Sequence, residues 1–221
     1  MAFEWCVVRV PVIAGKLRGA VMADARWPKG SLIKVAFTDG DEGLQARVFA
    51  AGKEWLTRTG ADLLFERIAK PEQADVRISF SLKGSWSVLG RYAAEQMGVT
   101  MNFGWLHPGS STEELREVVL HEFGHMLGFI HEHQNPDGGL RWNRDAVIAS
   151  LSQPPNSWSV EEIERNVLNQ EDPRDLIGTP FDPQSIMLYP FPAEWNENGI
   201  ATAANKDLSP NDIALARDIY T

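Results

Sequence analysis

The chain has 221 residues, of which 43% are apolar and 23% charged, and its formal net charge is −9. This composition is typical of a globular protein, and the length allows one domain with a substantial core. The excess of acidic residues repels phosphate backbones, so we exclude nucleic acid as a partner. Every apolar run is shorter than the roughly 20 residues that cross a bilayer, so we expect no membrane span.

The first 26 residues differ from the rest of the chain. Residues 1–26 form a mildly apolar lead-in, which we expect to be either a pro-segment or an extra strand around residues 7–13. The lead-in lacks the basic stretch and long apolar run of a secretory signal peptide, so the sequence leaves the cellular location open. Cys6 is the only cysteine, so no disulfide can form within the chain.

Residues 27–131 are predicted to form an N-terminal α/β subdomain. Alternating or apolar runs indicate three strands, at residues 31–37, 63–68 and 74–80. Between the first two, apolar residues at helical spacing from Leu44 to Trp55 indicate a helix that ends before Gly60. Two later runs are interpreted as irregular edge segments, at residues 85–90 and 99–103. The order of these elements favours a mixed, twisted sheet with helices packed on it.

A second long helix is predicted to begin after Ser111. This residue and Glu114 form a capping box, in which the hydroxyl accepts from the third helical amide and the carboxylate reaches back. Beyond Gly128 the chain becomes rich in Pro, Asn, Asp and Gly, so residues 132–221 are predicted to form a loop-rich C-terminal subdomain. Its expected helices lie at residues 160–170 and 209–220. The whole is predicted to be an α+β fold with two lobes.

Most of the histidines lie close together, just where the character of the chain changes. His121 and His125 are one helical turn apart and share a face, while Glu122 lies about 100° further around the axis. Gly128 can adopt the left-handed conformation that ends a helix, which allows His131 to return to the same point. Three neutral imidazoles that converge in this way suit one catalytic Zn²⁺. Glu122 is then placed to accept a proton from a water that the metal activates.

The remaining histidines have other interpretations. A fourth imidazole would close the metal site to substrate, so we expect His133 to support the site by hydrogen bonding. His107 precedes a proline and is expected to lie in a loop. The alternative that all these groups belong to an ordinary core helix is disfavoured, because burying a glutamate and two histidines without a role is costly.

Downstream residues extend the pattern and carry a family resemblance. Three histidines with Glu122 and Gly128, followed by Met187 in Ser-Ile-Met-Leu-Tyr, resemble the metzincin zinc endopeptidases. Glu132 directly after the third histidine, and Tyr189 two residues past the methionine, make the chain similar to the astacin branch. Two further segments agree with that branch, at residues 84–91 and 208–212.

The resemblance, which extends over residues 27–221, implies both a fold and an activity. The fold would be a metzincin-type domain, with a sheet and two long helices before the metal motif and a Met-turn and terminal helix after it. The activity would be zinc-dependent hydrolysis of internal peptide bonds, with Glu122 as general base. The resemblance further implies that Met187 forms a hydrophobic floor and that Tyr189 leaves the metal to stabilise the oxyanion. The metal ligands would be His121, His125, His131 and Tyr189.

The same resemblance implies partners and leaves alternatives open. The substrate would be a protein or peptide extended along a sheet edge, which we place within residues 85–103, and the chain would act as a monomer. Astacins are mostly secreted. Two other functions remain open, a zinc-stabilised binding protein without turnover and a zinc hydrolase of a non-peptide amide.

Three positions depart from the astacin pattern or stay ambiguous. Ser85 stands where astacins usually have a disulfide-bonded cysteine, so packing alone must stabilise this chain. Glu132 contacts the freed N-terminus in astacins, whereas here about 26 residues precede the domain. Cys6 is interpreted as an inert apolar residue, and the alternative is that its thiolate caps the zinc in a latent form.

Overall fold

The computed structural model describes residues 7–9, 21, 23–135, 138–169, 177 and 180–221. Its centre is a six-stranded sheet in the order β1-β5-β6-β4-β2-β3. The strands are β1 Val7–Arg9, β2 Ser31–Phe37, β3 Leu63–Arg67, β4 Val76–Ser79, β5 Ser85–Val88 and β6 Met101–Phe103. Strands β5 and β6 pair antiparallel, and the other neighbours in this sheet pair parallel, so the sheet is mixed as expected.

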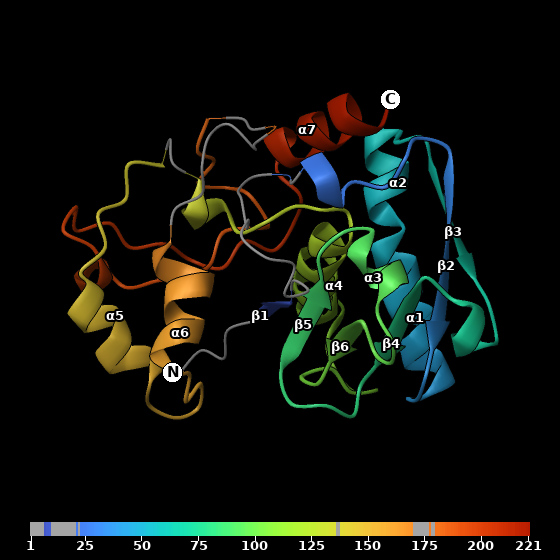
Figure 1. The fold of residues 1–221 in the computed structure, drawn as a ribbon, viewed down its shortest axis with the longest axis horizontal. Coiled ribbons are helices and arrows are strands. Elements are labelled where there is room, and N and C mark those ends of the chain that lie inside the picture. Colours follow the sequence, from blue (N-terminus) through green and yellow to red (C-terminus); the bar gives the residue numbers. More distant parts are fainter. Residues whose placement is uncertain (1–6, 10–20, 22, 136–137, 170–176, 178–179) are drawn as a thin grey trace.

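Helices pack against the sheet, and further helices separated by long loops make up the C-terminal part of the chain (Figure 1). The α-helices are α1 Glu42–Gly52, α2 Glu54–Thr59, α3 Tyr92–Glu95, α4 Thr112–Met126, α5 Arg144–Leu151, α6 Val160–Ile163 and α7 Pro210–Tyr220. A π-helix, Glu164–Leu168, continues α6 directly. Short 3-10 turns lie at Ala23–Ala25, Pro71–Gln73, Glu132–Gln134 and Ala193–Trp195.

The main core lies between the sheet and the helices α1, α2 and α4. Ile33 of β2 and Ile78 of β4 belong to the same buried cluster as Val48 of α1 and Phe123 of α4. Helices α1 and α4 approach closely at Gly52, where an added Cβ would lie 2.3 Å from the Phe123 ring. Burial of this apolar surface is what holds α4 against the sheet.

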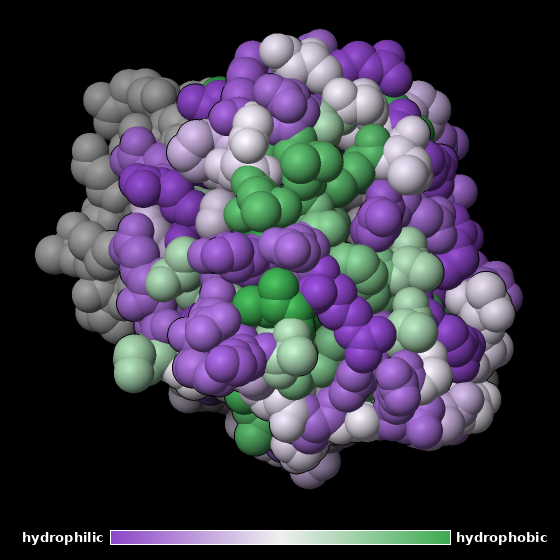
Figure 2. Space-filling view, turned by 90° about the vertical axis from the view of Figure 1, so that its right-hand side faces the viewer, coloured by the Kyte–Doolittle hydropathy of each residue, from purple (hydrophilic) through white to green (hydrophobic). Residues whose placement is uncertain are grey.

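The opposite face of β2 and β3 meets solvent. Leu32 and Leu64 are direct neighbours in the parallel register and are 47% and 64% exposed. Figure 2 views the molecule from the right-hand side of Figure 1 and shows apolar side chains interspersed with polar ones on that surface. The sheet is therefore covered by helices on one side at this edge, which explains the alternation predicted for the first strand.

Two predictions about the N-terminal subdomain differ from the structure. The single helix expected from Leu44 to Trp55 is divided into α1 and α2 at Lys53, although it ends at Gly60 as predicted, with φ +70°. The segments expected to be irregular edges are regular strands, β5 and β6. Both are only three or four residues long, too short for a clear alternation, and neighbouring strands determine their conformation.

The lead-in contributes a strand to this sheet. Val7–Arg9 form β1, which pairs parallel with β5 from Trp86 to Val88. Strand β5 therefore lies between β1 and β6, so the sheet edge predicted within residues 85–103 is covered by β1 in this structure. The rest of the predicted strand, at residues 10–13, and Cys6 lie outside the described residues.

The C-terminal part packs around a second apolar cluster beside the sheet. Its members include Val147 and Leu151 of α5, Ile163 of α6 and Trp195. Helix α5 was not predicted from the sequence, although Asn143 caps it and its two buried residues, Val147 and Leu151, are four positions apart. The helix predicted at residues 160–170 is present as α6 and the π-helix, and the helix predicted at residues 209–220 is present as α7, with Ser209 as its N-cap.

The carbonyl groups at the C-terminal end of α4 accept hydrogen bonds both from the turn that follows and from distant parts of the chain. Gly128 adopts φ +93°, and its amide donates to His125 O, while Phe129 N donates to Gly124 O. These are the two hydrogen bonds of a Schellman motif. The Trp27 indole donates to Met126 O at 2.8 Å, and the Tyr220 hydroxyl donates to Leu127 O at 2.6 Å.

The Tyr220 hydrogen bond gives a direct test of this cap. Tyr220 is fully buried, so Tyr220→Phe leaves the Leu127 carbonyl without its donor and should lower the free energy of unfolding by about 1–3 kcal/mol. The measurement is urea denaturation with both variants at one pH. The matched control is Tyr92→Phe, since Tyr92 is only partly buried and its hydroxyl makes no hydrogen bond to the described residues. Equal effects of the two substitutions would contradict the role of the cap.

Candidate metal centre

Three histidines converge at the C-terminal end of α4. His125 Nε2 lies 3.1 Å from His121 Nε2 and 3.1 Å from His131 Nε2. Each residue offers one nitrogen, and all three nitrogens lie within 4.8 Å of one another. Tetrahedral coordination with Zn–N bonds of about 2.0–2.1 Å places two ligand atoms about 3.3 Å apart. The donor spacing therefore fits a single zinc ion.

Backbone carbonyls orient two of these rings. His121 Nδ1 lies 2.8 Å from Ile186 O, and His125 Nδ1 lies 2.8 Å from Phe129 O. A carbonyl can only accept, so Nδ1 of each ring carries the proton and Nε2 presents its lone pair to the shared point. The same arrangement raises the basicity of an imidazole as a metal ligand.

Burial keeps the imidazoles neutral. Desolvation lowers the pKa of His121 to about 4. Desolvation, followed by the neighbouring histidines, holds the pKa of His125 and of His131 well below the ordinary value. These rings are therefore unprotonated at neutral pH, which is the form that binds a metal.

Glu122 lies beside this cluster and is almost completely buried, with 1% of its surface exposed. It follows His121 on α4, so its side chain leaves the helix about 100° from the first ligand. A buried carboxylate costs free energy unless it has a partner or a task. Glu122, which is predicted to be the base, therefore follows the first predicted ligand on α4 and lies in the interior of the protein.

Met187 packs directly beneath the same helix. A Cβ added at Gly124 would lie 2.4 Å from Met187 Sδ, so the missing side chain of Gly124 is what admits the methionine. Two hydrogen bonds to backbone carbonyls connect the same turn to the histidine segment. Ile186 O accepts from the His121 ring, and Met187 O accepts from the amide of Glu132, which follows His131, at 3.0 Å. The Met-turn therefore supports the metal centre both by packing and by hydrogen bonds.

Asp212, at the start of α7, holds the Met-turn in place. Its Oδ2 accepts from Ile186 N at 2.9 Å, and its Oδ1 accepts from the Ser185 hydroxyl at 2.7 Å. Asp212 also forms a capping box with Ser209 at the start of α7. No sequence signal indicates that a helix cap also binds a turn 26 residues earlier.

Tyr189 is brought next to the histidines. Its ring centroid lies 4.0 Å from that of His131 and 5.6 Å from that of His121, and 5% of the residue is exposed. His133 is also buried here, and desolvation lowers its pKa to about 3. His107, in contrast, lies in an exposed loop as predicted.

Glu132 has its partners within the described chain. Its Oε1 accepts from Asn135 Nδ2 at 3.1 Å and from Asp182 N at 2.9 Å. Desolvation, assisted by the charges of Asp212 and Asp182, raises the pKa of Glu132 to about 7. Among the described residues, the donors to this carboxylate oxygen are thus an amide side chain and a backbone N–H.

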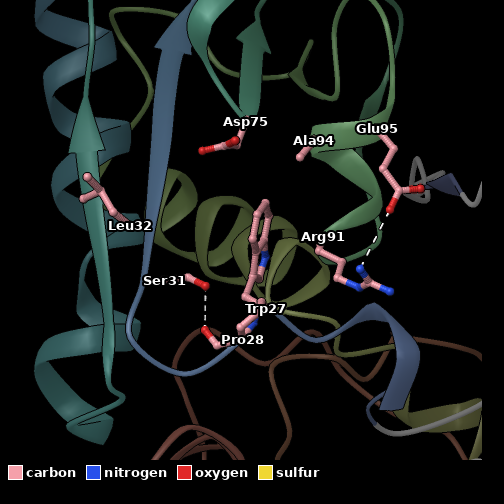
Figure 3. Close-up of a pocket in the computed structure, with 8 residues that line it drawn as sticks. All are labelled: Trp27, Pro28, Ser31, Leu32, Asp75, Arg91, Ala94 and Glu95. Atoms are coloured by element: carbon pink, nitrogen blue, oxygen red, sulfur yellow. Dashed lines mark hydrogen bonds and ion pairs between the residues drawn. The ribbon is translucent and has the colours of Figure 1, made fainter.

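A surface depression of about 310 Å³ lies elsewhere, bordered by Trp27, Asp75, Arg91 and Glu95 among others. Figure 3 shows the indole at its centre, with the acidic and basic side chains around it. None of the three converging histidines borders this depression. Among the described residues, the cluster of His121, His125 and His131 is the group that could bind a metal ion.

Comparison with known proteins shows which family this chain belongs to. The sequence model of Astacin, which describes a family of peptidases, matches residues 20–217. The chain belongs to the astacin family. Zinc metalloproteinase nas-36 of Caenorhabditis elegans is 28% identical over 179 residues, which make up 79% of this astacin and 25% of that protein. Human Tolloid-like protein 1 is 27% identical over 210 residues, or 88% of this chain and 19% of that protein.

This astacin thus spans about a quarter or less of the length of those two relatives. Solved structures match it more completely. Myroilysin superposes with a TM-score of 0.86 and 32% identity, over 91% of this chain and 98% of that one. High choriolytic enzyme 1, a hatching-enzyme zinc-protease of the medaka fish Oryzias latipes, shares the fold, with a TM-score of 0.59, 20% identity and coverage of 90% and 95%.

These matches confirm the resemblance to astacins and the predicted α+β fold. The family and the geometry together identify zinc as the metal for which the three imidazoles are positioned. Across the described part of this astacin, the structure contains no helix with the length and apolar character that crossing a bilayer requires.

The close packing of Met187 on α4 is testable by substitution. Alanine normally favours a helix over glycine by about 1 kcal/mol, but Gly124→Ala drives Cβ into Met187 Sδ and should instead destabilise the fold by about 1–3 kcal/mol. Thermal denaturation of the zinc-loaded protein measures this effect. In the double variant with Gly124→Ala and Met187→Ala, the loss of stability should be smaller than the sum of the losses in the two single variants. A stabilised single variant would contradict the packing described here.

Proposed function

We propose that the chain is a zinc-dependent endopeptidase that hydrolyses internal peptide bonds of protein substrates. The observation that carries the proposal is the convergence of three Nε2 atoms next in sequence to the buried Glu122, with that of His125 lying 3.1 Å from each of the other two. Membership in a family of peptidases supports the reaction type. His121, His125 and His131 would hold the metal, with Tyr189 as a further ligand in the resting state.

Zinc, when bound, supplies a positive charge that acidifies a water molecule and polarises the substrate carbonyl. Glu122 would accept the proton of that water and deliver it to the leaving amine. Its near-complete burial supports this role, because a carboxylate excluded from bulk water exchanges protons with the groups fixed next to it. The neutral imidazoles leave the full charge of the cation available for this task.

Tyr189 would stabilise the oxyanion of the tetrahedral intermediate. Its ring already packs on His131, so a small rotation would bring its hydroxyl from the metal to the developing charge. A donor that is aimed at an oxyanion contributes most when it is held in place before the reaction. The two predicted subdomains, residues 27–131 and 132–221, would then supply the imidazoles and this donor, respectively.

The substrate would extend along β5. This strand leads to Gly90, whose amide donates to His125 O at 2.9 Å, so its end is tied directly to the metal-binding helix. Strand β1 covers the outer edge of β5 in this structure. A peptide can pair with that edge by backbone hydrogen bonds only when β1 leaves it.

Glu122→Gln tests the assignment of the base. The amide keeps the shape of the side chain but cannot accept a proton, so kcat should fall by at least about 100-fold while zinc remains stoichiometric. Quenched-peptide hydrolysis and elemental analysis, run on the same preparation, measure the two quantities. The control is Glu114→Gln, in the exposed first turn of the same helix. Retention of full turnover by Glu122→Gln would refute the proposed role, and a wild-type protein that binds zinc without cleaving peptides would favour the binding-protein alternative.

Removal of β1 tests the proposed substrate path. A chain that begins at residue 21 keeps the bridge of Val21 with Phe129 and opens the outer edge of β5, so its kcat/KM on peptides should rise at least several-fold. Val8→Pro in the full chain should act in the same direction, because proline disfavours strand pairing. Unchanged kcat/KM in both proteins would show that substrate does not use this edge.

A further inference from the structure

His133 is a buried histidine that the proposed chemistry leaves without a task. It is fully buried, two residues beyond His131, at the start of the C-terminal subdomain. It does not belong to the converging group of three, although it lies next to them. Its ring contacts and hydrogen bond show where it acts.

The ring of His133 completes a stack with two rings of the metal centre. Its centroid lies 5.2 Å from that of His131, with 18° between the planes, and 5.0 Å from that of Tyr189, with 27° between the planes. His131 and Tyr189 are themselves 4.0 Å apart. Each of the three rings therefore contacts the other two, and Tyr189 cannot turn without sliding over His133.

The outer side of this stack is anchored to the π-helix. His133 Nε2 lies 3.0 Å from Asn166 O, so this nitrogen donates to a backbone carbonyl and presents no lone pair to a metal. The Asn166 side chain in turn donates to Glu162 O at 2.8 Å. The edge of the ring meets Trp142, at 5.8 Å and 84°. Short π-helical segments within α-helices are frequent at functional sites, and this one supplies the carbonyl that orients His133.

We propose that His133 is a positioning residue that transmits the fixed geometry of the π-helix to Tyr189 and thereby sets the resting direction of its hydroxyl. This role rests on the proposed function, which makes Tyr189 a metal ligand and oxyanion donor. In this role His133 would contact neither substrate nor metal. It acts through the tyrosine ring, because the His133–Asn166 bond fixes the His133 ring, and Tyr189 packs against both that ring and His131.

A double-substitution cycle with Tyr189→Phe tests the proposal. His133→Ala should lower kcat on a quenched peptide by about 10–100-fold, as supporting residues of metal sites do, with little change in KM. In the Tyr189→Phe background the same substitution should change kcat less than about 3-fold, because the hydroxyl that it positions is gone. His133→Phe retains an aromatic ring but loses the hydrogen bond to Asn166 O, so it should recover only part of the lost kcat. His107→Ala, in an exposed loop, is the matched control and should change nothing.

Cobalt substitution gives a second readout that does not depend on turnover. The visible absorption of the cobalt(II)-loaded protein should change in His133→Ala when Tyr189 is present and should stay the same when it is phenylalanine. Equal, multiplicative losses of kcat in both backgrounds, with unchanged cobalt spectra, would overturn the proposal and leave His133 a packing residue. If the wild type proved inactive on peptides, the proposed function would fail, and the cobalt spectra would still decide whether His133 positions Tyr189.

Discussion

The metal centre depends on one conformational constraint, the left-handed turn at Gly128. His121 and His125 share a face because they lie on one helix, but a continuing helix would carry His131 about 9 Å further along the axis than His125. Gly128, at φ +93°, ends α4 and reverses the chain, and two Schellman hydrogen bonds fix the reversal. The third imidazole returns to the site only because of this turn.

The rest of the fold supports that turn and the helix before it. Trp27 and Tyr220 donate to carbonyls at the C-terminal end of α4, from the segment before β2 and from the final helix, respectively. Met187 fills the space over Gly124, and Asp212 holds the turn that carries Met187. Residues near both ends of the described chain therefore determine the geometry of the ligands. A metal site that is built in advance in this way requires little reorganisation during the reaction.

Local sequence patterns were sufficient for the parts of the structure that depend on neighbouring residues. The capped helix after Ser111, the break at Gly128 and the final helix at residues 209–220 were predicted because each follows from the chemistry of a few adjacent residues. The converging histidines followed in the same way, from spacing on one helix and one glycine turn.

Other features could not be predicted, because they arise from contacts between residues that are distant in sequence. Strands β5 and β6 are strands because they lie within the sheet, and β1 covers β5 from a segment almost 80 residues earlier, with Val7 opposite Trp86. The bond from Asp212 to Ile186, and the stack that joins His133 to Tyr189, likewise have no local signature.

The most direct test of the account is X-ray absorption at the zinc edge of the purified, zinc-loaded chain. The account predicts one zinc per chain, with three imidazole nitrogens at about 2.0–2.1 Å and oxygen as the remaining coordinating atoms. Substitution of His131 by alanine should reduce the number of imidazole nitrogens to two. Fewer than three coordinating imidazoles in the wild-type protein, or a number unaffected by that substitution, would contradict the central claim.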